Sequence, residues 1–120
     1  MGKFTDLIVY QKAYRLALDI HLVTQKFPSE EKFGMISQIR RSSKSVCANF
    51  AESYRRRKYR RHFLSKLSDC LSENSETGVW LDFSKDLKFL SEEDYIDLRT
   101  RNEEVGRMLA FMVQYPEKFI

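Results

Sequence analysis

The sequence predicts an all-α protein, an up-down-up-down antiparallel four-helix bundle formed by a single domain over residues 1–120. Only four glycines and two prolines interrupt the chain, and no stretch alternates polar and apolar residues for long. Four segments instead carry apolar residues at helical spacing. Short connections between long amphipathic helices make neighbouring helices antiparallel, and this arrangement is a four-helix bundle.

The first predicted helix covers about residues 5–26. Apolar residues recur along it at alternating steps of four and three, which places them on one core-facing seam: Val9, Ala13, Leu16, Ile20, Val23 and Phe27. A second apolar set falls on roughly the opposite side of the helix: Leu7, Tyr14, Leu18 and Leu22. This is more apolar surface than one buried face requires, so the second set predicts a subunit interface.

The second predicted helix covers about residues 30–53. Pro28 disfavours helix at the preceding residue, and Ser29 is a suitable cap for a helix that starts with two glutamates. Its core line comprises Ile36, Ile39, Val46 and Phe50. A polar ladder follows beside that line at steps of three and four: Gln38, Arg41, Ser45, Asn49 and Glu52. The ladder is either an exposed helix face or a hydrogen-bonded network between helices or subunits.

The third and fourth predicted helices cover about residues 59–87 and 92–115. Phe63, Leu64, Leu67, Leu71 and Leu81 supply apolar contacts to the third, whose middle, SENSETG, is small and polar. Ser91 with Asp94 three residues later predicts the cap of the fourth helix. The fourth helix carries these apolar residues at heptad-like spacing and ends before Pro116: Tyr95, Leu98, Val105, Leu109 and Met112.

Composition narrows the classes of protein and site. Apolar residues make up 42% of the chain and charged residues 32%, which is typical of a folded globule with no membrane span. The first residues do not resemble a signal peptide, so we expect a cytoplasmic protein. Cys47 and Cys70 lie on apolar-periodic segments without a CxxC pattern, which predicts buried free thiols.

Catalytic and metal-binding patterns are missing from the sequence. Di-iron bundles use Glu-x-x-His pairs on two helices, whereas Glu73 and Glu76 have no histidine at that spacing. The chain also lacks a phosphate-binding glycine loop, a GxSxG motif and a local nucleophile–His–acid pattern. We therefore expect no enzymatic activity, no metal and no cofactor.

Positive charge is concentrated in one part of the chain. The net charge is +4, yet residues 40–66 hold ten Lys or Arg against one acid, Glu52, and the rest of the chain is net acidic. Ten residues are therefore predicted to contact nucleic acid: Arg40, Arg41, Lys44, Arg55, Arg56, Arg57, Lys58, Tyr59, Arg60 and Arg61. Tyr54, Tyr59 and Phe63 interleave with these cations and could stack on unpaired bases. The alternative is a solvated connection whose aromatic residues only close the end of the bundle.

Three stretches resemble the small four-helix-bundle proteins encoded by intervening sequences in bacterial 23S ribosomal RNA genes, often catalogued as ribosomal proteins. The stretches are FPSEEKFGMISQIRRSSKSVCANFAES, YRRRKYRRHF and LSENSETGVWLDF. The chain departs from the family pattern at Ser53, where glycine is usual, so we expect the second helix to run on or to end less sharply than a glycine would end it. The resemblance implies a homopentamer that forms a short barrel. It also implies a similarity to the accessory bundle protein of diversity-generating retroelements, which associates with nucleic acid and a reverse transcriptase.

These observations together predict a non-enzymatic, oligomeric bundle that binds nucleic acid, RNA first. The upstream cations Arg40, Arg41 and Lys44 extend the run of residues 55–61 into a basic stripe that recognises the nucleic-acid backbone. The alternative function is a protein-interaction scaffold whose basic face docks an acidic partner such as a polymerase. The two differ in whether the cations bind generic RNA and DNA in a salt-dependent way.

Overall fold

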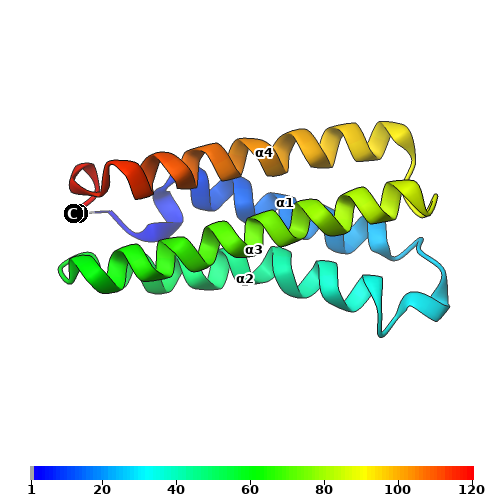
Figure 1. The fold of residues 1–120 in the computed structure, drawn as a ribbon, viewed down its shortest axis with the longest axis horizontal. Coiled ribbons are helices and arrows are strands. Elements are labelled where there is room, and N and C mark those ends of the chain that lie inside the picture. The colour runs from blue at the N-terminus through cyan, green and yellow to red at the C-terminus, as the bar shows by residue number, and fades with distance from the viewer. Residues whose placement is uncertain (1) are drawn as a thin grey trace.

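The structure is a computed structural model that describes residues 2–120. Four long helices account for most of it: α1 Ile8–Thr24, α2 Met35–Arg55, α3 Arg60–Asp86 and α4 Glu92–Gln114. They run alternately up and down along an axis of 44 Å, with cross-sections of 25 and 20 Å (Figure 1). The predicted all-α four-helix bundle is confirmed.

The two ends of the bundle carry different connections. The α2–α3 turn lies at the same end as the start of α1 and the end of α4, and the α1–α2 and α3–α4 connections lie at the other end (Figure 1). Short 3-10 helices stand at Phe4–Asp6, Ser29–Glu31 and Pro116–Lys118. Lys88, in the α3–α4 turn, adopts a left-handed backbone with φ 66°.

Two helix starts differ from the predicted ones. The first long helix begins at Ile8, because residues 4–6 form a separate 3-10 turn in which the Asp6 carboxylate accepts a bond from the Lys3 amide at 3.1 Å. The second begins at Met35 and not near residue 30, so Ser29 does not cap it. The Glu31 carboxylate accepts the otherwise unpaired amide N–H of Met35 at 3.2 Å, and so satisfies this helix end in place of a serine.

The end of α2 and the start of α4 follow from single serines. Ser53 is fully buried, its hydroxyl donates to the Phe50 carbonyl at 2.7 Å, and the helix continues to Arg55. This extension fits a serine where a glycine would terminate the helix more readily. Ser91 caps α4 as predicted, accepting the Asp94 amide N–H at 3.1 Å.

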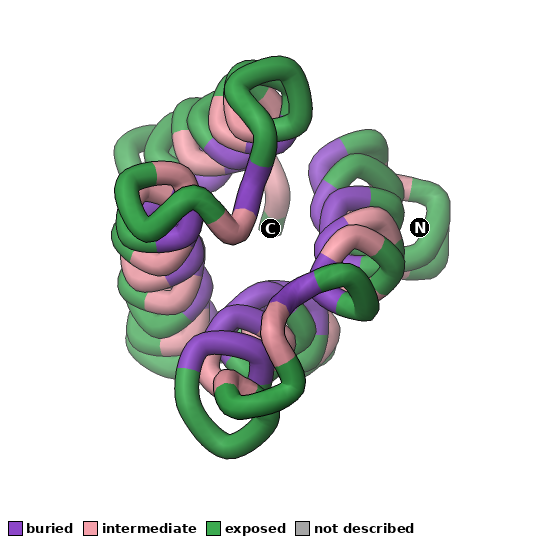
Figure 2. Tube along the Cα trace, turned by 90° about the vertical axis from the view of Figure 1, so that its right-hand side faces the viewer, coloured by how far each residue is buried: buried purple, intermediate pink, exposed green. Residues whose placement is uncertain are grey.

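The buried residues face the bundle axis and the exposed ones face outward (Figure 2). The buried apolar residues form two clusters. One lies towards the chain termini and includes Val9, Phe50, Phe63 and Leu109. The other lies towards the opposite end and includes Ile20, Ile39, Leu81 and Leu98.

A layer of buried polar residues lies between the two clusters. The Thr77 hydroxyl bonds that of Ser42 at 2.8 Å, which joins α3 to α2. Asn74 and Asn102 bond each other across the seam between α3 and α4. Each of these four side chains is at least 94% buried, and buried polar groups that are fully bonded favour one helix register over others.

Candidate nucleic-acid interface

The segment from Arg55 to Arg61, which we call the basic turn, is a tight reversal between two helices. Arg55 is the last residue of α2, and Arg60 and Arg61 open α3. The Arg56 amide bonds the Ser53 carbonyl at 3.0 Å, and the Tyr59 amide bonds the Arg56 carbonyl at 2.9 Å. The turn therefore places all the cations of the segment at one end of the bundle.

Five of these cations are available to a ligand. Arg55, Arg56, Lys58, Arg60 and Arg61 are exposed, and within residues 2–120 none has a carboxylate within 4.0 Å. Their mutual repulsion is not neutralised by the chain itself. The negative end of the α2 dipole and the positive end of the α3 dipole meet at this turn and oppose each other, so the side-chain cations set the local potential.

Arg57 differs from its neighbours in the basic turn. Its guanidinium lies 3.5 Å from the centroid of the Tyr54 ring, and one of its nitrogens donates to the Tyr54 carbonyl at 2.9 Å. A guanidinium stacked on a ring and bonded to a carbonyl is already partnered. Arg57 therefore closes the end of α2 more than it offers a phosphate contact.

The three aromatic residues of the predicted stacking set do not behave alike. Tyr54 is buried against Phe50, and Phe63 is fully buried in the core. Tyr59 alone among the three is exposed, at 62%. The stacking role is therefore contradicted for Tyr54 and Phe63, because the helical period turns both residues towards the bundle axis.

The three upstream cations do not all lie on one side of α2, so the predicted basic stripe does not include Arg41. Arg41 lies on the α3 side, where its guanidinium bonds the carboxylates of Glu73 and Glu76. The hydrogen bonds to both glutamates favour the charged form of the guanidinium and so raise the pKa of Arg41. Arg40 lies on the α1 side and donates to the Thr24 hydroxyl at 2.8 Å. Successive helix positions differ by about 100°, so these two neighbours turn towards different helices.

The predicted polar ladder is only partly a network. Arg41 donates to Gln38 at a long 3.4 Å and is held more firmly by α3, while Glu52 pairs with Lys66 of α3 at 3.0 Å. Within the described residues, neither Ser45 nor Asn49 makes a side-chain hydrogen bond. The ladder therefore joins α2 to α3 towards its two ends and is a half-buried face without side-chain hydrogen bonds between them.

The second apolar set of α1 divides in the same way. Tyr14, Leu18 and Leu22 are 50%, 41% and 55% exposed. Leu7 is instead half-buried against the core cluster at the termini, because it precedes α1 in extended backbone and folds inward. The subunit-interface prediction consequently rests on three residues of the four.

Between α1 and α2 lies a groove that the sequence did not reveal, with a volume of about 510 Å³. Tyr10, Tyr14, Leu18 and His21 line its α1 side, and Lys44 and Ala48 line its α2 side. We call it the tyrosine groove. The spacing of two tyrosines four residues apart was the available signal, but only the structure places Lys44 opposite them.

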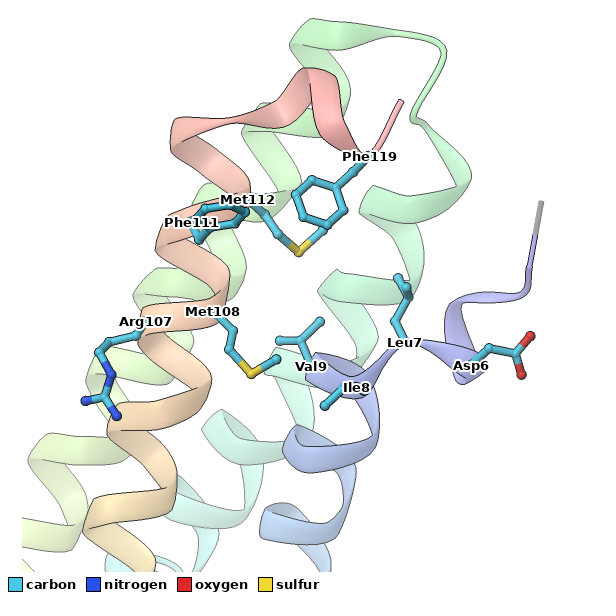
Figure 3. Close-up of a pocket in the computed structure, with 9 residues that line it drawn as sticks. All are labelled: Asp6, Leu7, Ile8, Val9, Arg107, Met108, Phe111, Met112 and Phe119. Atoms are coloured by element: carbon cyan, nitrogen blue, oxygen red, sulfur yellow. The ribbon is translucent and has the colours of Figure 1, made fainter.

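A second groove, of about 560 Å³, lies between the start of α1 and the end of α4 (Figure 3). Apolar side chains fill its lining: Leu7, Ile8, Val9, Met108, Phe111, Met112 and Phe119. Asp6 and Arg107 stand at its two sides, far from each other in Figure 3. With one cation and one acid at its edges, this apolar groove does not suit a polyanion.

The two cysteines are free and buried, as the sequence predicts. Burial raises the pKa of Cys47 to about 11 and that of Cys70 to about 12, so both thiols stay protonated at neutral pH. Among residues 2–120, no group of three His, Cys, Asp or Glu side chains is placed to hold a metal ion. Nor is any helix in that range long and apolar enough to cross a membrane.

Residues 5–111 match the sequence model of the family described as 23S rRNA-intervening sequence protein. This match spans most of the chain and includes the basic turn and most of the lining of both grooves. The protein belongs to the 23S rRNA-intervening sequence protein family. The predicted family is thereby confirmed, whereas the similarity to the retroelement accessory protein stays a prediction.

A solved member of the related S23 ribosomal protein family supports the same fold. It is a protein of unknown function from Bacteroides thetaiotaomicron, 27% identical to this chain, with a TM-score of 0.81. The alignment covers 89% of this intervening-sequence protein and 96% of the other chain. Comparison with curated proteins gave no match.

Proposed function

We propose that this protein is a non-enzymatic nucleic-acid-binding bundle, with RNA as its first candidate ligand, and that the basic turn contacts the phosphate backbone. This proposal rests on five exposed cations at one end of the bundle. No carboxylate of the described chain neutralises them. Unpaired guanidinium and ammonium groups clustered in this way are the usual electrostatic footprint of a polyanion site.

The family description is consistent with an RNA ligand. The description refers to intervening sequences of 23S ribosomal RNA, which suggests an RNA-related role. Such a ligand would be found in the cytoplasm. Contacts from exposed arginines and a lysine recognise phosphate positions and carry little sequence information. We therefore expect recognition of backbone and shape, with little preference for particular bases at the basic turn.

Self-association would strengthen such binding. Leu22 of α1, which is exposed, and the apolar groove between α1 and α4 offer surface for contacts between copies, and the family resemblance implies five. Each copy would add one basic turn, so a single nucleic acid that touches several turns would gain avidity without any new kind of contact.

Salt dependence is the direct test of this mechanism. About five phosphate contacts predict that log Kd changes with log salt by a slope near 3.5 for a single strand, a loss of roughly a hundredfold between about 50 and 200 mM salt. Fluorescence anisotropy with labelled generic RNA and DNA measures this slope. Binding that does not change with salt would contradict the proposal.

Two charge-reversal variants, one at each end of the bundle, separate this function from the scaffold alternative. Arg55, Arg56 and Arg60 changed together to Glu should abolish the salt-dependent binding, because all three are exposed and unpaired. Lys26, Lys32 and Lys88 changed to Glu alter the net charge equally at the opposite end and should retain most of it. If wild type and both variants bind equally weakly, the basic turn instead suits an acidic protein partner, such as a reverse transcriptase.

A further inference from the structure

The tyrosine groove contains a stack of rings that leads from the core to the surface. Tyr10 lies 6.2 Å from the Phe50 ring, which is buried, and stacks on Tyr14 with centroids 5.9 Å apart and planes inclined by 26°. Tyr14 ends the stack and is half exposed. A ring held from behind and open in front is a rigid platform on which another planar group can stack.

The α2 wall of this groove leads to the basic turn. Lys44, Ala48, Ala51 and Arg55 recur at steps of four, three and four, so they lie on the same side of α2. The small side chains of the two alanines leave room along this side of α2 between the two cations. Lys44 and Arg55 are separated by roughly 16 Å along the helix, given a rise of about 1.5 Å per residue. Lys44 and Arg55 have no carboxylate partner within the described chain.

The lining of the groove is also free of acids. Its residues are aromatic, aliphatic, small, cationic or histidine: Tyr10, Tyr14, Ala17, Leu18, His21, Lys44, Cys47 and Ala48. Aromatic platforms beside cations are the combination by which proteins hold unpaired nucleic acid, because every base has a stacking face and every nucleotide a phosphate.

We propose that the tyrosine groove binds a single-stranded nucleic acid, with a base stacked on Tyr14 and phosphates held by Lys44 and Arg55. This proposal rests on the function proposed above and adds that the ligand is single-stranded. A duplex can contact the basic turn through its phosphates, but its bases are paired and stacked within the helix. Only an unpaired strand can bring a base onto Tyr14.

A second copy of the chain is the competing occupant of this surface, because Tyr14 and Leu18 are exposed apolar residues. The charges favour the nucleic acid. A copy that covered the groove would enclose Lys44, and the groove lining offers no carboxylate to neutralise it. A phosphate backbone supplies that negative charge at every step.

The test compares one RNA of about ten nucleotides as a single strand and as a duplex. Tyr14→Ala should lower single-strand affinity by about five- to a hundredfold, the range expected for one lost stacking contact, and leave duplex affinity unchanged. Tyr14→Phe keeps the ring and should bind as wild type does. Phe33→Ala, which removes an exposed ring outside the groove lining, is the matched control.

Each result separates this proposal from the function on which it rests. A wild type that binds neither RNA overturns both. If the variant with Glu at 55, 56 and 60 loses both RNAs while Tyr14→Ala loses neither, nucleic-acid binding by the basic turn stands and the groove proposal fails. Light scattering supplies the third readout: if Tyr14→Ala lowers the assembled mass, the groove is a contact between copies and the proposal is overturned.

Discussion

Asn74 and Asn102 bond each other reciprocally across the seam of α3 and α4. The Asn74 amide donates to the Asn102 backbone carbonyl at 3.1 Å, and the Asn102 amide donates to the Asn74 carbonyl at 3.1 Å. Each asparagine precedes a glycine by four residues, and each glycine lies against the asparagine of the other helix. A Cβ at Gly106 would lie 2.6 Å from the Asn74 side-chain oxygen. The two Asn-x-x-x-Gly segments therefore form one close-packed crossing.

Gly106→Ala should destabilise the protein, although alanine ordinarily favours a helix interior by about 0.5–1 kcal/mol. The added methyl group meets an amide that two hydrogen bonds hold in place, so either the bonds or the helix spacing must change. We expect a net loss of about 1–3 kcal/mol in the free energy of unfolding. Urea denaturation followed by circular dichroism measures it.

The control keeps the added methyl group and removes the Asn74 side chain that it would meet. In an Asn74→Ala background, Gly106→Ala should become neutral or stabilising, because the oxygen it would meet is absent. Gly78→Ala should cost less than Gly106→Ala, since its nearest contact is the flexible end of Arg99 at 2.6 Å. A stabilising effect of Gly106→Ala in the otherwise wild-type protein would show that the crossing is not closely packed.

This crossing illustrates which features the sequence could predict. Helical periodicity predicted the number and direction of the helices, because the apolar seams are long and regular. The middle of the third helix, by contrast, read only as small and polar. Periodicity identifies a core-facing position but not which helix lies opposite, so the pairing of Asn74 with Asn102 depends on the tertiary structure.

The same limit applied to the candidate site. Sequence spacing located the cations of the basic turn correctly as a group, because adjacent residues stay together in any fold. It could not assign Arg41 to two α3 glutamates more than thirty residues away, nor bring Lys44 opposite Tyr10 and Tyr14. Long side chains choose partners on neighbouring helices, and those neighbours are fixed only by packing.

Arg41 should contribute to stability and not to nucleic-acid binding. Its guanidinium pairs with Glu73 and Glu76, so Arg41→Ala should leave RNA affinity within about twofold of wild type, whereas Arg60→Ala should reduce the salt slope by about one contact. The loss of stability should be at most about 1 kcal/mol, because the pair is half exposed and water screens it. Anisotropy titrations and thermal melts measure the two effects. Equal losses of affinity in both variants would restore Arg41 to the binding surface.

Leu22 should contribute to self-association. It is 55% exposed on the outward side of α1 and does not line the tyrosine groove. A second copy packed on this side of α1 would cover an apolar side chain that the bundle itself leaves exposed. Leu22→Glu would bury a charge in such a contact and should lower the assembled mass.

Mass photometry of Leu22→Glu beside Gln25→Glu gives this comparison. Gln25 is an exposed polar residue immediately after α1, so its substitution adds the same charge without removing apolar surface. Identical masses for wild type and both variants would exclude Leu22 from any contact between copies.

His21 reports the electrostatic state of the tyrosine groove. Burial lowers its pKa from the usual 6.5, and the positive charges of Arg40 and Lys44 lower it further. Because the unfolded chain takes up the proton first, His21 should reduce stability as pH falls below 6.5, and the reduction should level off once pH passes the folded pKa. An NMR titration of the His21 ring should give a midpoint below that of the urea-unfolded protein. Lys44→Gln removes one of the two positive charges and should raise the midpoint, and a bound strand whose phosphates lie beside Lys44 should raise it as well. A midpoint unaffected by saturating single-stranded RNA would place the strand outside the groove.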